Sequence, residues 1–138
     1  MLGSVRVLVV DNDPTARMLT NSLLINWGYE PVLAMGTGNK LIIDAKEKAR
    51  TKSCVLALID MRLYDDEDKD DDSGLILADE LEKKIRCVIL SGYRDEKILL
   101  RVIQEKKNIN FLLKNTPVET LRESIEIEVR KVSALKRN

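Results

Sequence analysis

The chain has 138 residues, enough for one domain to bury a core without disulfides or a structural metal, and we expect a single domain over residues 1–138. Its 23 Lys and Arg residues balance 23 Asp and Glu residues, so no overall basic charge favours direct binding of nucleic acid. Histidine is absent, which excludes histidine-based catalytic triads and His-ligated zinc sites, and no segment is long and apolar enough for a membrane span or a secretion signal, so we expect a cytoplasmic protein.

Short apolar runs alternate along the chain with longer segments of helical periodicity. Strands are expected at 5–10, 29–34, 54–59, 86–91 and 109–113, and helices from Pro14 to about Trp27 and at about 38–50, 74–84, 95–106 and 117–135. Three of the strands are apolar enough to be buried on both faces, and Cys54 and Cys87 in these apolar runs are expected to be reduced core residues. Strict alternation predicts an α/β three-layer sandwich: five parallel strands with helices on both faces.

One irregular segment interrupts this pattern. Residues 64–74 read YDDEDKDDDSG and are too acidic to be buried. Three of its aspartates have the spacing of a calcium-binding loop, but Ser73 stands where such a loop requires glycine, so a solvated, mobile loop is the stronger prediction. The segment GTGNK at 36–40 lacks the last glycine of a dinucleotide-binding loop and predicts a turn.

Polar side chains stand at the carboxyl ends of four of the five expected strands. They are Asp11 with Asp13, Asp60, Ser91 and Lys114. Ligands of an open parallel sheet bind beyond these ends, near the point where the strand order reverses. If the first and third strands are neighbours, three carboxylates converge on one pocket, where they repel one another unless a cation compensates. Mg²⁺ with Lys114 would do so, and Ser91 could donate to a phosphoryl oxygen there.

Each of these residues also has a purely structural interpretation. Asp11 or Asp13, taken alone, is equally consistent with a cap of the following helix. Ser91 before Gly92 is also consistent with a turn, and Lys114 is also consistent with an exposed strand end. Asp60 is harder to explain in this way, because no helix begins directly after it. The joint placement of these side chains is what predicts a functional site.

In this order and spacing, the segments VLVVDNDPTAR, LALIDMRL, VILSGYRDE and FLLK resemble a receiver domain of the two-component response regulator family, over essentially the whole chain. The resemblance implies a flavodoxin-like fold with strand order 2-1-3-4-5. It implies that Asp60 is phosphorylated from the phosphohistidine of a histidine kinase or of a phosphotransfer protein in a phosphorelay, with Mg²⁺ as cofactor. The aspartate then acts as a covalent acceptor, and the protein is not an enzyme with a separate substrate.

The resemblance also assigns roles to the other residues at the strand ends. It implies a metal held by Asp11, by Asp60 and by the backbone of Arg62, with Asn12 as a weak ligand and Asp13 as a partial substitute. It implies that Ser91 and Lys114 contact the phosphoryl group. Ser91 and Phe111 would be the switch residues that move on phosphorylation, although Phe111 is equally consistent with a plain core residue.

The chain departs from the usual pattern of the family in three places. Asn12 stands where the family usually has the second of two adjacent acids, so weaker metal binding is expected. The acidic segment is an insertion after Met61, which lacks the usual following proline. Asn115 follows Lys114 where the family typically has a proline in the cis form. These departures leave open a degenerate receiver that acts as a phosphorylation-independent interaction module.

A second alternative is a phosphatase of the haloacid dehalogenase type, because DNDPT fits the DxDxT signature of that family. Such a phosphatase requires a further acidic pair on a strand after the lysine, whereas only a helix is expected beyond Lys114. It also leaves Asp60 without a role. The receiver interpretation is therefore preferred, with a separate effector protein or self-association as the output and with no membrane partner.

Overall fold

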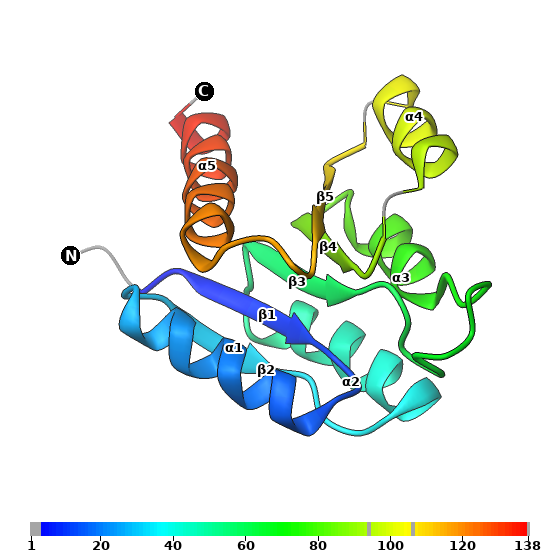
Figure 1. The fold of residues 1–138 in the computed structure, drawn as a ribbon. Helices are drawn as coiled ribbons and strands as arrows, with labels where there is room; N and C mark the ends of the chain where they lie inside the picture. Colours follow the sequence, from blue (N-terminus) through cyan, green and yellow to red (C-terminus); the bar gives the residue numbers. More distant parts are fainter. Residues whose placement is uncertain (1–3, 94, 106, 138) are drawn as a thin grey trace.

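The computed structural model describes residues 4–93, 95–105 and 107–137. Strands and helices alternate through these residues as the sequence predicts (Figure 1). They are β1 (Arg6–Val10), α1 (Pro14–Asn26), β2 (Glu30–Leu33), α2 (Gly38–Thr51), β3 (Leu56–Asp60), α3 (Ser73–Leu81), β4 (Arg86–Ser91), α4 (Glu96–Gln104), β5 (Ile109–Leu113) and α5 (Val118–Arg137). None of the described helices is both long and apolar enough to cross a bilayer.

The strands form one sheet in the order β2-β1-β3-β4-β5, and every neighbouring pair is parallel. The predicted α/β fold and its strand order are confirmed. The order reverses between β1 and β3, which lie side by side with Val10 opposite Ile59. The carboxyl ends of these two strands therefore lie at the switch point of the sheet, the place where ligands of open parallel sheets bind.

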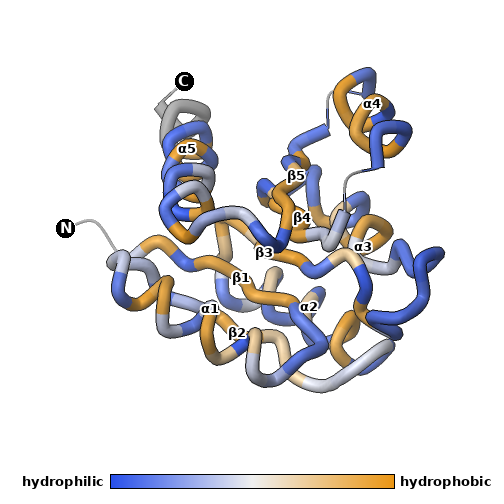
Figure 2. Tube along the Cα trace, in the orientation of Figure 1, coloured by the Kyte–Doolittle hydropathy of each residue, from blue (hydrophilic) through white to orange (hydrophobic). Residues whose placement is uncertain are grey.

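The core has two layers because side chains alternate across the sheet. One cluster packs α2, α3 and α4 against side chains such as Leu8 and Ile89, and the other packs α1 and α5 against Val9 and Leu58. In Figure 2 the strands are hydrophobic almost throughout, as expected for parallel strands covered on both faces. The expectation of buried, reduced cysteines is confirmed.

Helix α1 begins and ends with the signals present in the sequence. The Asp13 carboxylate accepts a hydrogen bond of 3.0 Å from the Thr15 N–H, and Pro14 occupies the first turn. Gly28 follows the end of the helix with a φ of 90°, a conformation that glycine adopts without a steric penalty. Asp13 is thus the helix cap that the sequence left as one of two alternatives.

In the segment between β3 and α3, residues 64–70 are exposed and form a hydrophilic loop, as Figure 2 shows, and this loop is folded by its own hydrogen bonds. Asp71 organises it: one carboxylate oxygen accepts from the N–H groups of Tyr64 and Asp65 at 2.9 Å, and the other accepts from the Ser73 hydroxyl at 2.6 Å. Partial burial raises the pKa of Asp71, but these hydrogen bonds outweigh it, and the pKa lies below its ordinary value. The insertion therefore has a defined path from Asp60 to α3.

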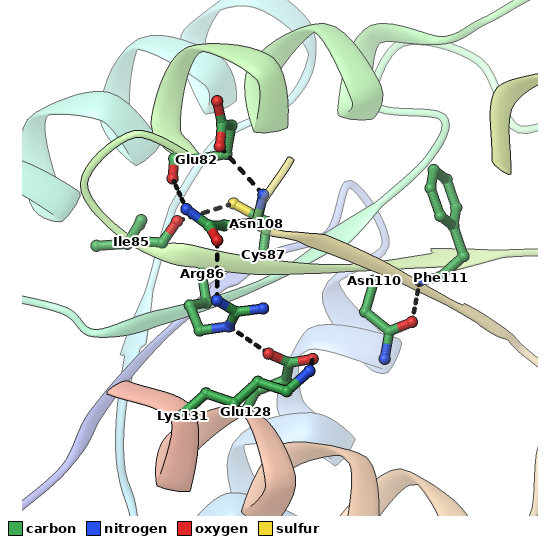
Figure 3. A network of polar contacts seen from close by, with 9 residues as sticks. All are labelled: Glu82, Ile85, Arg86, Cys87, Asn108, Asn110, Phe111, Glu128 and Lys131. Atoms are coloured by element: carbon green, nitrogen blue, oxygen red, sulfur yellow. Dashed lines mark hydrogen bonds and ion pairs between the residues drawn. The ribbon is translucent and has the colours of Figure 1, made fainter. Parts of the chain in front are cut away.

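A polar network holds α5 against the amino-terminal ends of the strands (Figure 3). Glu128 on α5 is buried, with 2% of its side chain exposed, and pairs with Arg86 at the start of β4. Arg86 also donates a 2.9 Å hydrogen bond to the side chain of Asn108, whose amide donates to the backbone carbonyl of Glu82. This network lies at the end of the sheet opposite Asp60 and Ser91.

Candidate functional site

The residues predicted to form the site come together at the carboxyl edge of the sheet. Asp60 and Ser91 are the last residues of β3 and β4, and Asp11 and Lys114 directly follow β1 and β5. Lys114 reaches across β4, so that its Nζ lies 2.9 Å from Oδ1 of Asp60. Two segments that are far apart in the sequence, the end of β3 and the residue after β5, thus meet at one carboxylate.

Asp60 is buried, with only 2% of its side chain exposed. Burial raises its pKa above the ordinary value, because it disfavours the charged form, and the Lys114 ammonium group offsets only part of this effect. Its second carboxylate oxygen, Oδ2, is buried and has no hydrogen-bond partner among the described residues. An unsatisfied buried carboxylate oxygen is unfavourable unless a further positively charged or hydrogen-bonding group contacts it.

Asp11 supplies a second carboxylate beside Asp60. Burial raises the pKa of Asp11 to about 6, the hydrogen bond from the Asp13 N–H counteracts this, and the charge of Asp60 raises it further. The pKa of Lys114 is also raised: burial lowers it, but the charges of Asp60 and Asp11 more than compensate. The site therefore concentrates negative charge that a single ammonium group does not balance.

Asn12 and Asp13 differ in their suitability for a metal. Asn12 Oδ1 is buried and, within the described part of the chain, has no hydrogen-bond partner. The Asp13 carboxylate instead caps α1, so a direct role in metal binding would require it to leave that cap. No group of three or more His, Cys, Asp or Glu side chains among the described residues could hold a metal ion. Binding of one metal ion by Asp11, Asp13 and Asp60 together therefore stays a prediction.

The remaining oxygen atoms nevertheless fit Mg²⁺. This ion commonly binds one or two carboxylates and keeps several water molecules, so it does not require three protein carboxylates. Asp11 and Asp60 supply carboxylates, and the unpartnered oxygen atoms of Asp60 and Asn12 are free to accept a cation or its water molecules. The role of the Arg62 backbone remains a prediction.

Ser91 and Phe111 line a cavity of about 390 Å³ beside the site, together with Tyr93 and Leu99. The Ser91 hydroxyl donates a 2.7 Å hydrogen bond to the carbonyl oxygen of Tyr93. Phe111 is half-buried and packs against the core, as its structural interpretation expects. The guanidinium group of Arg62 lies over the Tyr93 ring, 4.6 Å from its centroid, and so links the loops after β3 and β4.

Two residues of the site's framework were missed from the sequence. Arg17 on α1 is buried, and its guanidinium donates to the carbonyl oxygens of Asp11 at 2.8 Å and of Gly36 at 3.1 Å, which ties the loop after β1 to the loop after β2. Its spacing of seven residues from buried Leu24 places it on the inner face of the helix and was the available signal. Gly74 packs so tightly that a Cβ there would lie 2.0 Å from the carbonyl oxygen of Asp60.

The Lys114–Asn115 bond, where the family typically has a cis proline, is trans, since no cis peptide occurs in the described residues. The N–H of Lys114 donates a 2.8 Å hydrogen bond to the carbonyl oxygen of Ser91. This bond continues the pairing of β4 with β5 by one residue, so the lysine is held beside Ser91 without the usual proline.

Solved structures of receiver domains are similar to this chain over nearly their whole length. A CheY-like response regulator receiver domain from Methanospirillum hungatei JF-1 shares 21% identity and has a TM-score of 0.75, covering 96% of this chain and 98% of its own. A response regulator from Thermotoga maritima shares 16% identity and has a TM-score of 0.71, and the match covers 92% of this chain and 98% of that structure. The BeF3-activated receiver domain of RstA from Klebsiella pneumoniae shares 19% identity and has a TM-score of 0.71, and the match covers 91% of this chain and 98% of that structure. No protein-family model and no curated protein matches the sequence.

Proposed function

We propose a function for this chain from its fold, which is that of response regulator receiver domains. From this fold and its site we propose that it is a phosphoacceptor of a two-component or phosphorelay system, which takes a phosphoryl group onto Asp60 with Mg²⁺. The observation that carries the proposal is the environment of Asp60: a buried carboxylate at the carboxyl end of β3, with Lys114 on one oxygen and, among the residues that the structure describes, no side chain or backbone group bonded to the other.

The two oxygen atoms of Asp60 suggest how the acceptor works. Oδ1 is held by Lys114, while Oδ2 has no hydrogen-bond partner in the described part of the chain and would attack the phosphorus atom of the donor phosphohistidine. The new bond joins Oδ2 to phosphorus as the nitrogen–phosphorus bond breaks, and the electron pair leaves with the imidazole. Lys114 stabilises charge on a transferring oxygen, and Mg²⁺, when bound, neutralises further charge on these oxygens.

Ser91 would then report the new charge. Its hydroxyl is engaged with the Tyr93 carbonyl and must leave this bond to donate to a phosphoryl oxygen. The cavity beside it gives Phe111 room to reorient as Ser91 moves. The proposed phosphodonor is a cytoplasmic histidine kinase or a phosphotransfer protein. The phosphorylated form would act on a separate effector protein or on a second copy of the chain.

A second candidate keeps the fold without the chemistry. Asn12 favours it, because an amide replaces a carboxylate at a position where the resemblance implies a metal ligand. In that case the chain is an interaction module that binds its partner whether or not a phosphodonor is present. The phosphatase alternative has no comparable support, since Asp13 caps α1 and the described chain after β5 continues into α5.

The test is incubation with acetyl phosphate and Mg²⁺, followed by intact mass measurement and mapping of the modified residue. We expect one phosphoryl group per chain on Asp60, no labelling of Asp60→Asn, and strongly reduced labelling of Lys114→Ala. Repeated turnover of an aryl phosphate would favour the phosphatase. No labelling, combined with unchanged partner binding after Asp60→Asn, would favour the interaction module.

A further inference from the structure

We infer that Arg17 on α1 is a positioning residue of the Asp60 pocket. Its guanidinium group fixes the peptide unit between Asp11 and Asn12, and in this way it determines how tightly a divalent cation binds there. The inference rests on the proposed function, because it places the cation in the Asp60 pocket. Arg17 acts through the backbone of the site, since its hydrogen bonds near the pocket go to a carbonyl oxygen and not to a carboxylate.

The contacts of Arg17 go to the loops that follow β1 and β2. The residue is 5% exposed. Its Nη2 and Nε donate hydrogen bonds of 2.8 and 3.3 Å to the carbonyl oxygen of Asp11, and Nη2 also donates a 3.1 Å bond to the carbonyl oxygen of Gly36. Its Nη1 lies 3.8 Å from the sulfur atom of Met35. All of these acceptors are uncharged.

A buried guanidinium group with only uncharged acceptors is not explained by stability of the fold. Burying a charge costs free energy that an ion pair with a carboxylate offsets, and among the described residues Arg17 has only these uncharged acceptors. An apolar side chain of similar length would fill the inner face of α1 without burying a charge. The need to hold two carbonyl oxygens in place does explain an arginine at this position.

The sheet provides no backbone donor for the carbonyl oxygen of Asp11. The pairing of β1 with β2 ends where the Ala34 N–H donates a 3.0 Å hydrogen bond to the carbonyl oxygen of Val9, two residues before Asp11. Beyond that point the chain leaves the sheet through Gly36, whose φ of 105° lies in the region that favours glycine. Arg17 therefore supplies the N–H groups that a longer β2 would have supplied.

The peptide unit that Arg17 holds joins two of the oxygen-bearing side chains of the site. Its carbonyl belongs to Asp11 and its N–H to Asn12, whose Oδ1 is buried without a hydrogen-bond partner in the described residues. Because a peptide unit is planar, its rotation changes ψ of Asp11 and φ of Asn12 together and turns both side chains. Two N–H groups of a planar guanidinium on one oxygen atom oppose this rotation. Mg²⁺ demands near-ideal octahedral geometry, so displaced ligands lower its affinity.

The loop at the other end of these contacts is itself anchored. The N–H of Met35 donates a 2.7 Å hydrogen bond to the Asp44 carboxylate on α2, and Asp44 pairs with Lys48 at 2.9 Å. Lys48 also donates a 2.8 Å hydrogen bond to the carbonyl oxygen of Leu33, the last residue of β2. Arg17 therefore holds the loop after β1 against a loop that α2 keeps in place.

The experiment measures binding of Mn²⁺ alone, by the electron paramagnetic resonance signal of the free ion, with calorimetric titration of Mg²⁺ as a second readout. The variant is Arg17→Met. The matched control is Arg86→Met, which also removes a largely buried guanidinium group, but at the opposite end of the sheet. We expect Arg17→Met to weaken binding of either ion about tenfold and Arg86→Met to change it by less than about 1.5-fold.

Urea unfolding in EDTA separates the two effects of these substitutions. Both variants should unfold at lower urea concentration than the wild type, and circular dichroism checks that each is folded under the conditions of the binding assay. Equal losses of Mn²⁺ affinity in Arg17→Met and Arg86→Met would overturn the inference, because the loss would then follow stability and not position. An unchanged affinity of Arg17→Met would overturn it as well.

Arg17→Lys tests whether the planar contact or the charge alone is required, and it carries the test if Arg17→Met does not fold. Lysine keeps the charge, but its single nitrogen atom cannot place two N–H groups side by side on one carbonyl oxygen. We expect Arg17→Lys to bind Mn²⁺ at least about threefold more weakly than the wild type. An affinity equal to that of the wild type would overturn the inference.

Asp60→Asn separates failure of the inference from failure of the proposed function. If Asp60→Asn abolishes Mn²⁺ binding while both variants of Arg17 bind like the wild type, only the role of Arg17 is wrong. If Asp60→Asn binds Mn²⁺ like the wild type, or if the wild type binds none, the ion does not occupy this pocket. The proposed site and the inference are then both contradicted.

Discussion

Replacement of Asp11 by asparagine in metal-free buffer should stabilise the protein at neutral pH and have little effect in mild acid. Burial raises the pKa of Asp11 to about 6, compared with 3.8 for the ordinary carboxyl group. The folded protein therefore binds this proton more tightly than the unfolded chain does, and ionisation of Asp11 opposes folding. The penalty is absent below about pH 3.8, grows as the pH rises, and is complete above about pH 6.

The size of the effect follows from the difference between these two pKa values. Each pKa unit corresponds to about 1.4 kcal/mol, so full ionisation of Asp11 destabilises the folded state by about 3 kcal/mol, or about 2 kcal/mol after solvent screening. Asparagine keeps an oxygen atom that can accept the hydrogen bond from the Asp13 N–H, so only the charge is removed.

Urea unfolding followed by circular dichroism, in EDTA at about pH 4.5 and about pH 7.5, measures the effect. All other titrating groups are common to both proteins, so the difference between wild type and Asp11→Asn isolates Asp11. The variant should be more stable at the higher pH, with a much smaller difference at the lower pH. A difference that is the same at both pH values, or a variant that is less stable at neutral pH, would refute the reasoning.

Three further predictions follow from the packing. Gly74→Ala places a Cβ 2.0 Å from the carbonyl oxygen of Asp60 and 2.8 Å from Cα of Met61. It should therefore destabilise the protein by about 2–3 kcal/mol and reduce labelling by acetyl phosphate. The control Gly92→Ala, whose Cβ would have nothing within 4 Å, should be nearly neutral in stability. Equal urea midpoints for these two variants would contradict this. Arg86→Ala leaves buried Glu128 without its main partner and should lower the free energy of unfolding by about 3 kcal/mol or more. The control Arg6→Ala, which removes an exposed ion pair with Glu30, should lower it by less than about 1 kcal/mol. Comparable losses in denaturant titrations would show that burial of the pair does not matter. Burial raises the pKa of the Cys87 thiol to about 12 and also raises the pKa of Cys54. Both thiols should therefore resist alkylation at about pH 8 in the native state and react after denaturation. Rapid labelling of the native protein would contradict this.

The fold could be predicted because its signals are local. Apolar runs of strand length alternate with amphipathic segments, and Pro14 and Gly28 mark the ends of α1. The strand order came from the resemblance, since alternation of strands and helices alone does not specify it. Asp60, Ser91 and Lys114 were identifiable because the carboxyl ends of parallel strands share one edge of the sheet.

The details that were missed depend on contacts between distant segments. No local pattern distinguishes Asp13 as a helix cap from Asp13 as a metal ligand, because both roles place an acid after a strand. Burial of Arg17 becomes necessary only when the carbonyl of Gly36 is brought beside it, and the close approach of Gly74 to Asp60 depends on where α3 docks. Glu128 looks like an exception to the apolar face of α5 until Arg86 is seen beside it.

The central claim is that Asp60 accepts a phosphoryl group in a pocket that also holds a divalent ion. A crystal structure of the protein with Mg²⁺ and beryllofluoride, a mimic of the phosphoryl group, tests it most directly. The account predicts beryllofluoride attached to Oδ2 of Asp60, with Lys114 and the Ser91 hydroxyl in contact with its fluorine atoms and Mg²⁺ beside Asp11 and Asn12. Electron density that leaves Asp60 unmodified at saturating beryllofluoride and Mg²⁺, with Lys114 still paired to its carboxylate, would contradict it.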